Sequence, residues 1–167
     1  MADFYRVCGG FSENPKEAIA VKIIHEAAIA MQKEADLNPS RLKSEFLQNL
    51  YQSGRSAIAL RNDEEIIAHA AVIGPDSGHK LAEIAMVWVH PDHRGNGWAS
   101  RVFEEAMRIL RALHYPAFLL TRSSAVAAMA TRRGWIEVDA AFNDSIFARQ
   151  RERGSRVFLL PATLGGA

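Results

Sequence analysis

One segment constrains the fold of this chain more than any other part of the sequence. Residues 87–99 join an apolar run to a glycine-containing turn, and a long amphipathic pattern follows directly. Between residues 97 and 113, apolar side chains recur with the 3.6-residue period of a helix, while charged side chains occupy the opposite face. The first amides of a helix have no partner inside it and lie at the positive end of its dipole. The segment therefore predicts a strand, a turn suited to an anion, and a helix that packs one face on the core.

Local patterns predict the elements around this segment. Strands are expected where short apolar runs lie between polar or glycine-containing turns, at residues 4–7, 56–60, 66–73, 81–89, 117–121, 135–138 and 157–160. Helices are expected where apolar residues recur at helical spacing, at residues 18–35, 42–50, 97–113 and 124–132. The first of these helices has Asn14 as its expected cap. The three runs between residues 56 and 89 are joined by short turns, which predicts three neighbouring antiparallel strands.

Length, charge and cysteine content exclude several classes of protein. The 167 residues suit one ordinary domain, so we expect residues 1–167 to form a single domain. The net charge of +1, from 20 Lys and Arg against 19 Asp and Glu, gives no overall field that would attract nucleic acid or a membrane. Cys8 is the only cysteine, so no intramolecular disulfide can form and a cytoplasmic location is expected. No uncharged stretch approaches the roughly 20 residues of a membrane helix.

The turn carries a more specific pattern. Arg94, Gly97 and Ala99 stand in the order R-x-x-G-x-A, and Val89 and Pro91 precede them as V-x-P-x-x-R. This string resembles the acyl-CoA signature of the GNAT acetyltransferase superfamily, and the order of elements agrees from about residue 56 to residue 138. The resemblance implies an α/β fold with a central mixed, mostly antiparallel, splayed sheet flanked by helices. It also implies an enzyme that passes the acetyl group of acetyl-CoA to an amine by direct attack in a ternary complex.

The resemblance assigns the cofactor-binding residues as well. In the family, the strand before the turn pairs with the pantetheine arm, here through Val87, Trp88 and Val89. The turn and the helix start hold the pyrophosphate, here through Arg94, Gly95, Asn96, Gly97, Trp98, Ala99 and Ser100. Ser123 stands where the family commonly has an Asn that contacts pantetheine, so it is a weaker candidate. A Walker loop is excluded because no Gly-Lys-Ser/Thr follows, and a dinucleotide fingerprint is excluded because the helix lies outside an initial βαβ unit.

Glu83 is the candidate catalytic residue. An amine arrives as an ammonium ion and must lose a proton before it can attack a thioester, so a base or a water chain to one is needed. Glu83 lies between Ala82 and Ile84 in a predicted strand, and this string resembles the histone-acetylating branch, in which the Glu of that strand is the base. The alternative is a carboxylate at a frayed strand end that faces water.

The sequence departs from the family at the position of the general acid. The family often supplies a Tyr four residues before the glycine that ends the next helix, and Ala130 occupies that position before Gly134. This departure favours a non-catalytic acyl-CoA-binding sensor or interaction domain as the alternative function.

A toxin-like acyltransferase on aminoacyl-tRNA is a further alternative, in which the basic residues of a predicted loop would contact phosphate: Arg149, Arg151, Arg153 and Arg156. The acceptor, a small-molecule or peptide amine, and a homodimeric state are left open.

Four histidines are candidates for metal ligands or catalytic bases. His90 and His93 have H-x-x-H spacing, but the sequence offers no third ligand or helical register beside them, so we expect no metal. His25 and His69 lie in apolar helix and strand patterns, which predicts core or rim positions rather than catalytic ones.

Overall fold

The computed structural model describes residues 2–9, 17–35, 39–62, 64–75, 80–139 and 145–160. Its strands are β1 (Tyr5–Gly9), β2 (Ser56–Arg61), β3 (Glu65–Ile73), β4 (Ala82–Val89), β5 (Ala117–Thr121), β6 (Ile136–Val138) and β7 (Arg156–Leu160). Its helices are α1 (Glu17–Ala35), α2 (Ser44–Gln52), α3 (Trp98–Leu113), α4 (Ser124–Arg132) and α5 (Ser145–Glu152). Two short 3₁₀ helices, η1 (Pro39–Leu42) and η2 (Pro91–His93), lie before α2 and after β4. The predicted strands and helices are all present, with ends shifted by a few residues at most.

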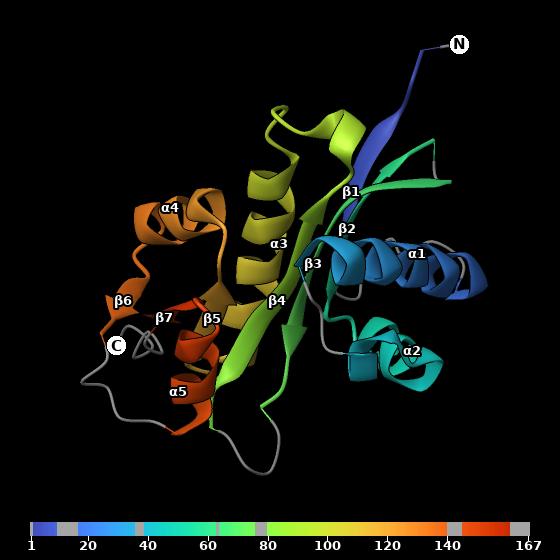
Figure 1. The fold of residues 1–167 in the computed structure, drawn as a ribbon. Coiled ribbons are helices and arrows are strands. Elements are labelled where there is room, and N and C mark those ends of the chain that lie inside the picture. The colour runs from blue at the N-terminus through green and yellow to red at the C-terminus, as the bar shows by residue number, and fades with distance from the viewer. Residues whose placement is uncertain are drawn as a thin grey trace.

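The strands form one mixed sheet in the order β1-β2-β3-β4-β5-β7-β6. Strands β2, β3 and β4 are neighbouring and antiparallel, as predicted. The pairing of β4 with β5 is parallel and covers a short stretch, in which residues 82–84 of β4 face residues 117–119 of β5. Beyond this stretch the two strands diverge, so the sheet opens between them (Figure 1).

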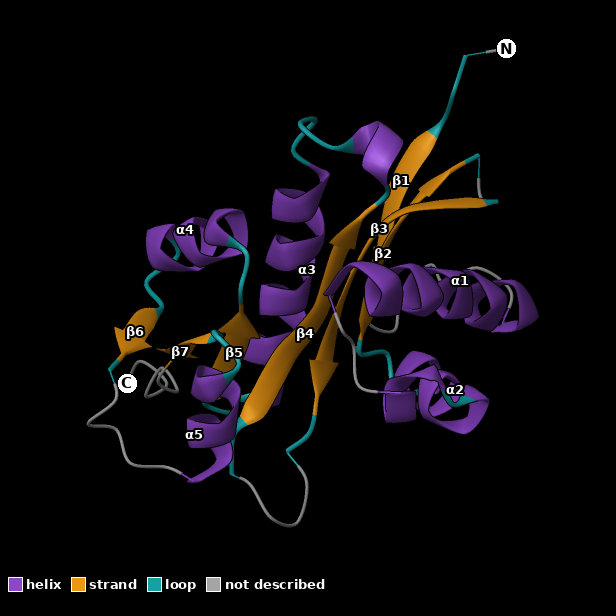
Figure 2. Cartoon of the chain, in the orientation of Figure 1, coloured by secondary structure: helices purple, strands orange, loops and turns teal. Residues whose placement is uncertain are grey.

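Helices cover both faces of the sheet (Figure 2). Helices α3 and α4 bury one face, where Phe103 and Leu110 of α3 belong to the same core cluster as Val72 of β3. Helices α1 and α2 bury the other face, where Ile24 and Leu47 pack in one cluster with strand residues. Burial of each such side chain contributes about 1.5–3 kcal/mol of hydrophobic free energy. Strand β4 contributes residues to both core clusters, and packing on both of its faces holds it in position.

Helix α5 differs from the prediction. The arginines near the C-terminus were expected in a loop, but Arg149 and Arg151 lie in α5 and Arg156 lies in β7, paired with Glu137 at 2.7 Å. Phe147 of α5 is fully buried against Phe118, with ring centroids 5.2 Å apart. Among the described side chains of this helix, residues 147–152, Phe147 is the one that is buried, which leaves little helical periodicity to detect in the sequence.

Some predictions concern residues outside the described ranges. The cap at Asn14, the turn residue Asp63 and the turn at residues 76–78 are among them. Of the helices that are described, none has both the length and the hydropathy needed to cross a membrane.

Candidate active site

Strand β4 carries a bulge at Met86. His69 of β3 faces Trp88, but Ala71, two residues further along β3, faces Ala85, so β4 contains one extra residue between them. The extra residue coincides with Met86, whose φ is +56°. A positive φ is unfavourable for a residue with a side chain, so surrounding contacts must hold it. The bulge lies where β4 leaves β5 and re-aims the rest of the strand, as bulges beside active sites commonly do.

A buried histidine holds this bulge. His69 is fully buried, and its Nδ1 lies 3.0 Å from the Met86 carbonyl oxygen. Burial lowers the pKa of His69 to about 4, and the hydrogen bond to the carbonyl offsets this only in part. Near neutral pH the ring is therefore uncharged, with Nδ1–H donating to the carbonyl. Its Nε2 is buried and has no partner among the described residues. The predicted core position of His69 is confirmed, while its contact with the bulge was not foreseen.

The burial of His69 predicts a pH dependence of stability. The ordinary pKa of histidine is 6.5, and in the folded protein it falls to about 4. As the pH drops from 6.5 to 4, the unfolded chain therefore binds a proton that the folded chain does not, and stability falls. Over the whole window the free energy of unfolding is expected to decrease by about 3 kcal/mol from this group.

Urea unfolding at pH 7, 6, 5 and 4.5 measures this loss. His69→Gln should lower stability at pH 7 but show a flatter decline toward pH 4.5. His25→Gln, at a half-buried histidine of α1, is the control that should keep the parent slope. Parallel curves for the parent and His69→Gln would show that His69 does not titrate in this way.

The turn after β4 forms a cradle at the start of α3. Gly95 and Gly97 have φ values of +81° and +78°, and Gly97 is the residue at the helix N-cap. A Cβ at Gly97 would meet nothing within 4 Å among the described residues, so the space beside the backbone is open. The first turn of α3 carries no acidic residue, which leaves its amides and dipole available to an anion. Within the turn, the Arg94 Nε donates to the Val89 carbonyl at 3.0 Å.

A cavity of about 470 Å³ connects this cradle to the diverging edge of β4. Nine of the residues predicted to bind the cofactor line it, namely Val87, Trp88, Val89, Arg94, Gly95, Gly97, Trp98, Ala99 and Ser123. Four further lining residues were not predicted as cofactor contacts: Met31, His93, Ala125 and Val126. Met31 comes from α1 and the last two from α4, helices whose sequences carry no signature for this role.

Asn96 and Ser100, two of the predicted contacts, are not among the lining residues. The Asn96 side chain donates to the His93 carbonyl at 3.3 Å and thereby ties the turn together. The Ser100 hydroxyl accepts a 2.5 Å hydrogen bond from Arg133. Ser123 lines the cavity and also caps α4, because its hydroxyl accepts from the Val126 amide at 3.3 Å.

Two features of the cavity fit an acyl-CoA. Beyond residue 84, the edge of β4 that faces away from β3 has no β5 partner in the described sheet, so an extended pantetheine arm can pair with it. The indole Nε1 of Trp88 is buried without an acceptor among the described residues, although the side chain lines the cavity. A buried donor without a partner costs about 1–3 kcal/mol, which a ligand oxygen would recover only where the ring turns its N–H into the cavity.

Glu83 lies near the start of β4, before the bulge. Its neighbours Ala82 and Ile84 belong to the core under α3, so by the alternation of strand residues Glu83 faces the α1 and α2 side. The Glu83 carboxylate accepts a 2.6 Å hydrogen bond from Arg41 of η1, and the two side chains are 14% and 23% exposed. The alternative of a frayed, water-facing carboxylate is therefore excluded. Glu83 is not among the residues that line the cavity.

The mixed sheet opens beside β4, and a turn with two positive-φ glycines lies between the end of that strand and α3. The chain belongs to the GNAT acetyltransferase family: the model described as "Acetyltransferase (GNAT) family" matches residues 22–135, well over half of the chain. A search of curated proteins gave no significant match.

Solved structures show the same fold at low sequence identity. An acetyltransferase from Streptococcus agalactiae has a TM-score of 0.62 at 20% identity, covering 93% of this chain and 96% of that one. A GNAT-family acetyltransferase from Staphylococcus aureus has a TM-score of 0.65 at 12% identity, with coverages of 96% and 100%. N-acetylglutamate synthase from Neisseria gonorrhoeae, complexed with coenzyme A and N-acetyl-glutamate, has a TM-score of 0.63 at 15% identity. There the match covers 96% of this chain and 35% of the synthase.

Proposed function

We propose that this protein is an N-acetyltransferase that binds acetyl-CoA in the cavity beside β4 and transfers the acetyl group to an amine. The observation that carries the proposal is the continuity of the cavity, which joins the open glycine cradle of α3 to the unpaired edge of β4. Family membership supports an acyl-CoA donor, and coenzyme A is bound in the structurally similar Neisseria synthase. The experiment that tests the proposal is a joint measurement of thiol release and amine acetylation.

Different groups of the protein bind different parts of acetyl-CoA. Backbone amides of the cradle, at the N-terminus of α3, hold the pyrophosphate, and Arg94 adds a positive charge beside them. The backbone of Val87, Trp88 and Val89 pairs with the pantetheine arm as an added strand would. A backbone N–H beside the bulge at Met86 polarises the thioester carbonyl, and His69 keeps that backbone in place through its hydrogen bond to the Met86 carbonyl.

Glu83 serves as the base that receives the amine's proton. Because Glu83 does not line the cavity, the proton reaches its carboxylate through water on the α1 and α2 side of the sheet. Arg41 fixes the orientation of the carboxylate. Once this proton is lost, the nitrogen lone pair attacks the carbonyl carbon, the carbon–sulfur bond breaks, and the sulfur leaves with its electron pair. The second proton of the attacking nitrogen passes through water to the thiolate, which leaves the amide and free CoA.

The departing sulfur does not require an acid at residue 130. Ala130 is fully buried in the same core cluster as Phe103 and Trp135, so it faces the protein interior. A free thiol has a pKa of about 8.5, so a thiolate is a tolerable leaving group and water can protonate it. Loss of the family's Tyr is therefore compatible with catalysis. The same feature favours the second candidate, a non-catalytic acyl-CoA sensor, in which binding occurs without transfer.

A further inference from the structure

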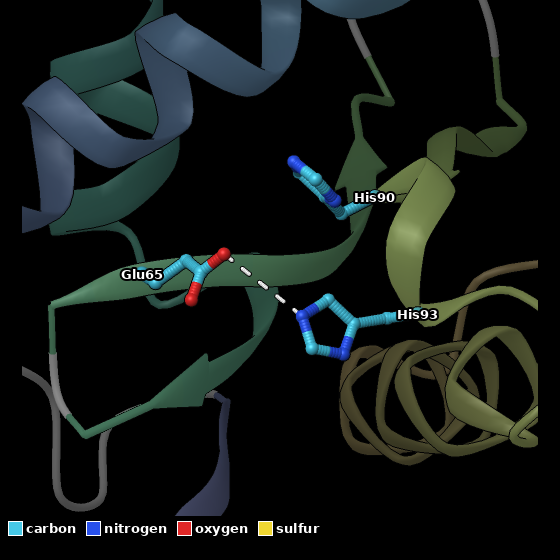
Figure 3. Close-up of side chains that lie close together, drawn as sticks. All are labelled: Glu65, His90 and His93. Atoms are coloured by element: carbon cyan, nitrogen blue, oxygen red, sulfur yellow. Dashed lines mark ion pairs between the residues drawn. The ribbon is translucent and has the colours of Figure 1, made fainter.

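Three potential metal ligands lie close together where β3 begins and β4 ends (Figure 3). Glu65 begins β3, His90 follows β4 directly, and His93 ends η2. One ligand atom from each residue lies within 4.8 Å of the other two, and the His93 Nε2 is 3.9 Å from the Glu65 Oε1. The expectation that the two histidines lack a third ligand is therefore wrong, because the sheet brings Glu65 to them from a distant part of the sequence.

We propose that Glu65, His90 and His93 bind one divalent transition-metal ion of the zinc, cobalt or nickel type. Two imidazole nitrogens and one carboxylate oxygen form a donor set that these ions prefer, whereas Mg²⁺ and Ca²⁺ favour oxygen alone. Ligand atoms around a tetrahedral zinc ion lie about 3.3–3.5 Å apart, given bonds of about 2.0–2.1 Å. The 3.9 Å between His93 and Glu65 therefore needs to close by about 0.5 Å, and the widest pair of the cluster, at up to 4.8 Å, by up to about 1.4 Å. A fourth position stays open to water.

The surrounding groups orient the ligands. Arg61 holds the other oxygen of Glu65, Oε2, at 3.2 Å, which leaves Oε1 directed at His93. Arg61 also forms an ion pair with Asp3, in which the Arg61 Nη2 lies 3.1 Å from the Asp3 Oδ2. The Asp3 carboxylate offsets part of the positive charge beside the site. The His90 Nδ1 accepts from the Asp92 backbone N–H at 3.2 Å.

Aromatic neighbours keep the imidazole rings in place. His93 is mostly buried, with 14% of its side chain exposed, and it meets the ring of Tyr5 edge-on at 6.3 Å. His90 meets Trp88 in the same manner at 5.9 Å. Rings that are already ordered lose little freedom on binding, which favours a bound ion. His93 also lines the cavity and lies just before the cradle. A bound ion would therefore link the turn after β4 to Glu65 at the start of β3. The metal site does not depend on acetyl transfer.

Metal titration of the whole chain, purified without a histidine tag and stripped with a chelator, tests the proposal. Calorimetry with Zn²⁺ should give one ion per chain, and Co²⁺ should develop the visible absorption of a four- or five-coordinate nitrogen and oxygen site. Glu65→Gln should weaken Zn²⁺ binding at least 10-fold, since losing even a residue that only supports a ligand costs about 10- to 100-fold. His90→Asn, which leaves the pairing of Arg61 with Glu65 intact, should weaken it to a similar extent.

Glu64→Gln is the matched control, because Glu64 is exposed on the same hairpin and does not belong to the cluster. It should bind Zn²⁺ as the parent does, and far-ultraviolet circular dichroism should report the same fold for all variants. The proposal is overturned if the parent shows no saturable binding. It is equally overturned if Glu65→Gln and His90→Asn both bind as tightly as the parent, because the ion then resides elsewhere.

Discussion

Replacing Glu83 by Gln is expected to lower turnover by about 10²- to 10⁴-fold near neutral pH, the usual effect of losing a positioned base. The amide has nearly the same shape as the carboxylate and can still accept the hydrogen bond from Arg41, but it cannot take up the amine's proton. Steady-state kinetics with a verified acceptor measure the loss. The rate of Glu83→Gln should recover at high pH, where the acceptor amine deprotonates without help, while the dissociation constant of acetyl-CoA should stay near the parent value.

Glu45→Gln provides the control for this experiment. Glu45 is an exposed carboxylate in the first turn of α2, on the same side of the sheet as Glu83. It should leave turnover unchanged. Equal turnover of Glu83→Gln and the parent would remove Glu83 from the mechanism, whereas parallel losses of rate and acetyl-CoA affinity would indicate a structural role.

Replacing Gly97 by Glu is expected to abolish the stabilisation that acetyl-CoA gives the protein. At 100 times its dissociation constant, a ligand stabilises the folded state by about 2.7 kcal/mol, a rise of about 5–10 °C in Tm for a chain of this size. A side chain at Gly97 would extend into the open space of the cradle, and a carboxylate there would repel the pyrophosphate. Differential scanning fluorimetry with and without acetyl-CoA measures the effect.

A substitution at a second glycine distinguishes the loss of the cradle from the effect of backbone strain alone. Any side chain at Gly97 adopts an unfavourable positive φ of +78°, which costs about 1–2 kcal/mol in the free protein as well. Gly154 lies at a φ of +84°, also with open space around it, but in the turn before β7 and outside the cavity lining. Gly154→Glu should therefore lose similar stability and keep the full acetyl-CoA shift. A full shift in Gly97→Glu would mean that the pyrophosphate binds elsewhere.

The features that the sequence predicts most accurately are those determined by residues close together in the chain. The bounds of β5 and α4 agree with their prediction because each is a short apolar pattern between clear turn or cap signals. The cradle was predicted for the same reason, since its glycines and the apolar stripe of α3 are contiguous in the chain. Helix α5 was missed because Phe147, the one buried residue among its described side chains, produces no periodicity.

Contacts between distant segments account for what could not be predicted. Arg41 pairs with Glu83 across 42 positions of sequence, and no local pattern marks either residue as the other's partner. The bulge at Met86 has no sequence signal, because its positive φ falls on a residue that rarely adopts one. Glu65 approaches His93 only because β3 and the turn after β4 meet in the folded sheet. The strand-turn-helix segment therefore predicted the glycine turn and most of the residues that line the cavity, but not the contacts that support them.

The measurement that distinguishes a transferase from a sensor follows acetyl-CoA and the amine in the same reaction. Purified protein is incubated with acetyl-CoA and each member of a panel of small amines, amino acids, peptides and aminoacyl-tRNA, and free thiol and acetylated amine are quantified by mass spectrometry. We predict that at least one acceptor yields acetylated product in equal amount to the CoA released, at a rate that Glu83→Gln strongly reduces. If acetyl-CoA binds and raises Tm but no acceptor yields product above background, the transferase assignment is contradicted and the sensor function is the correct one.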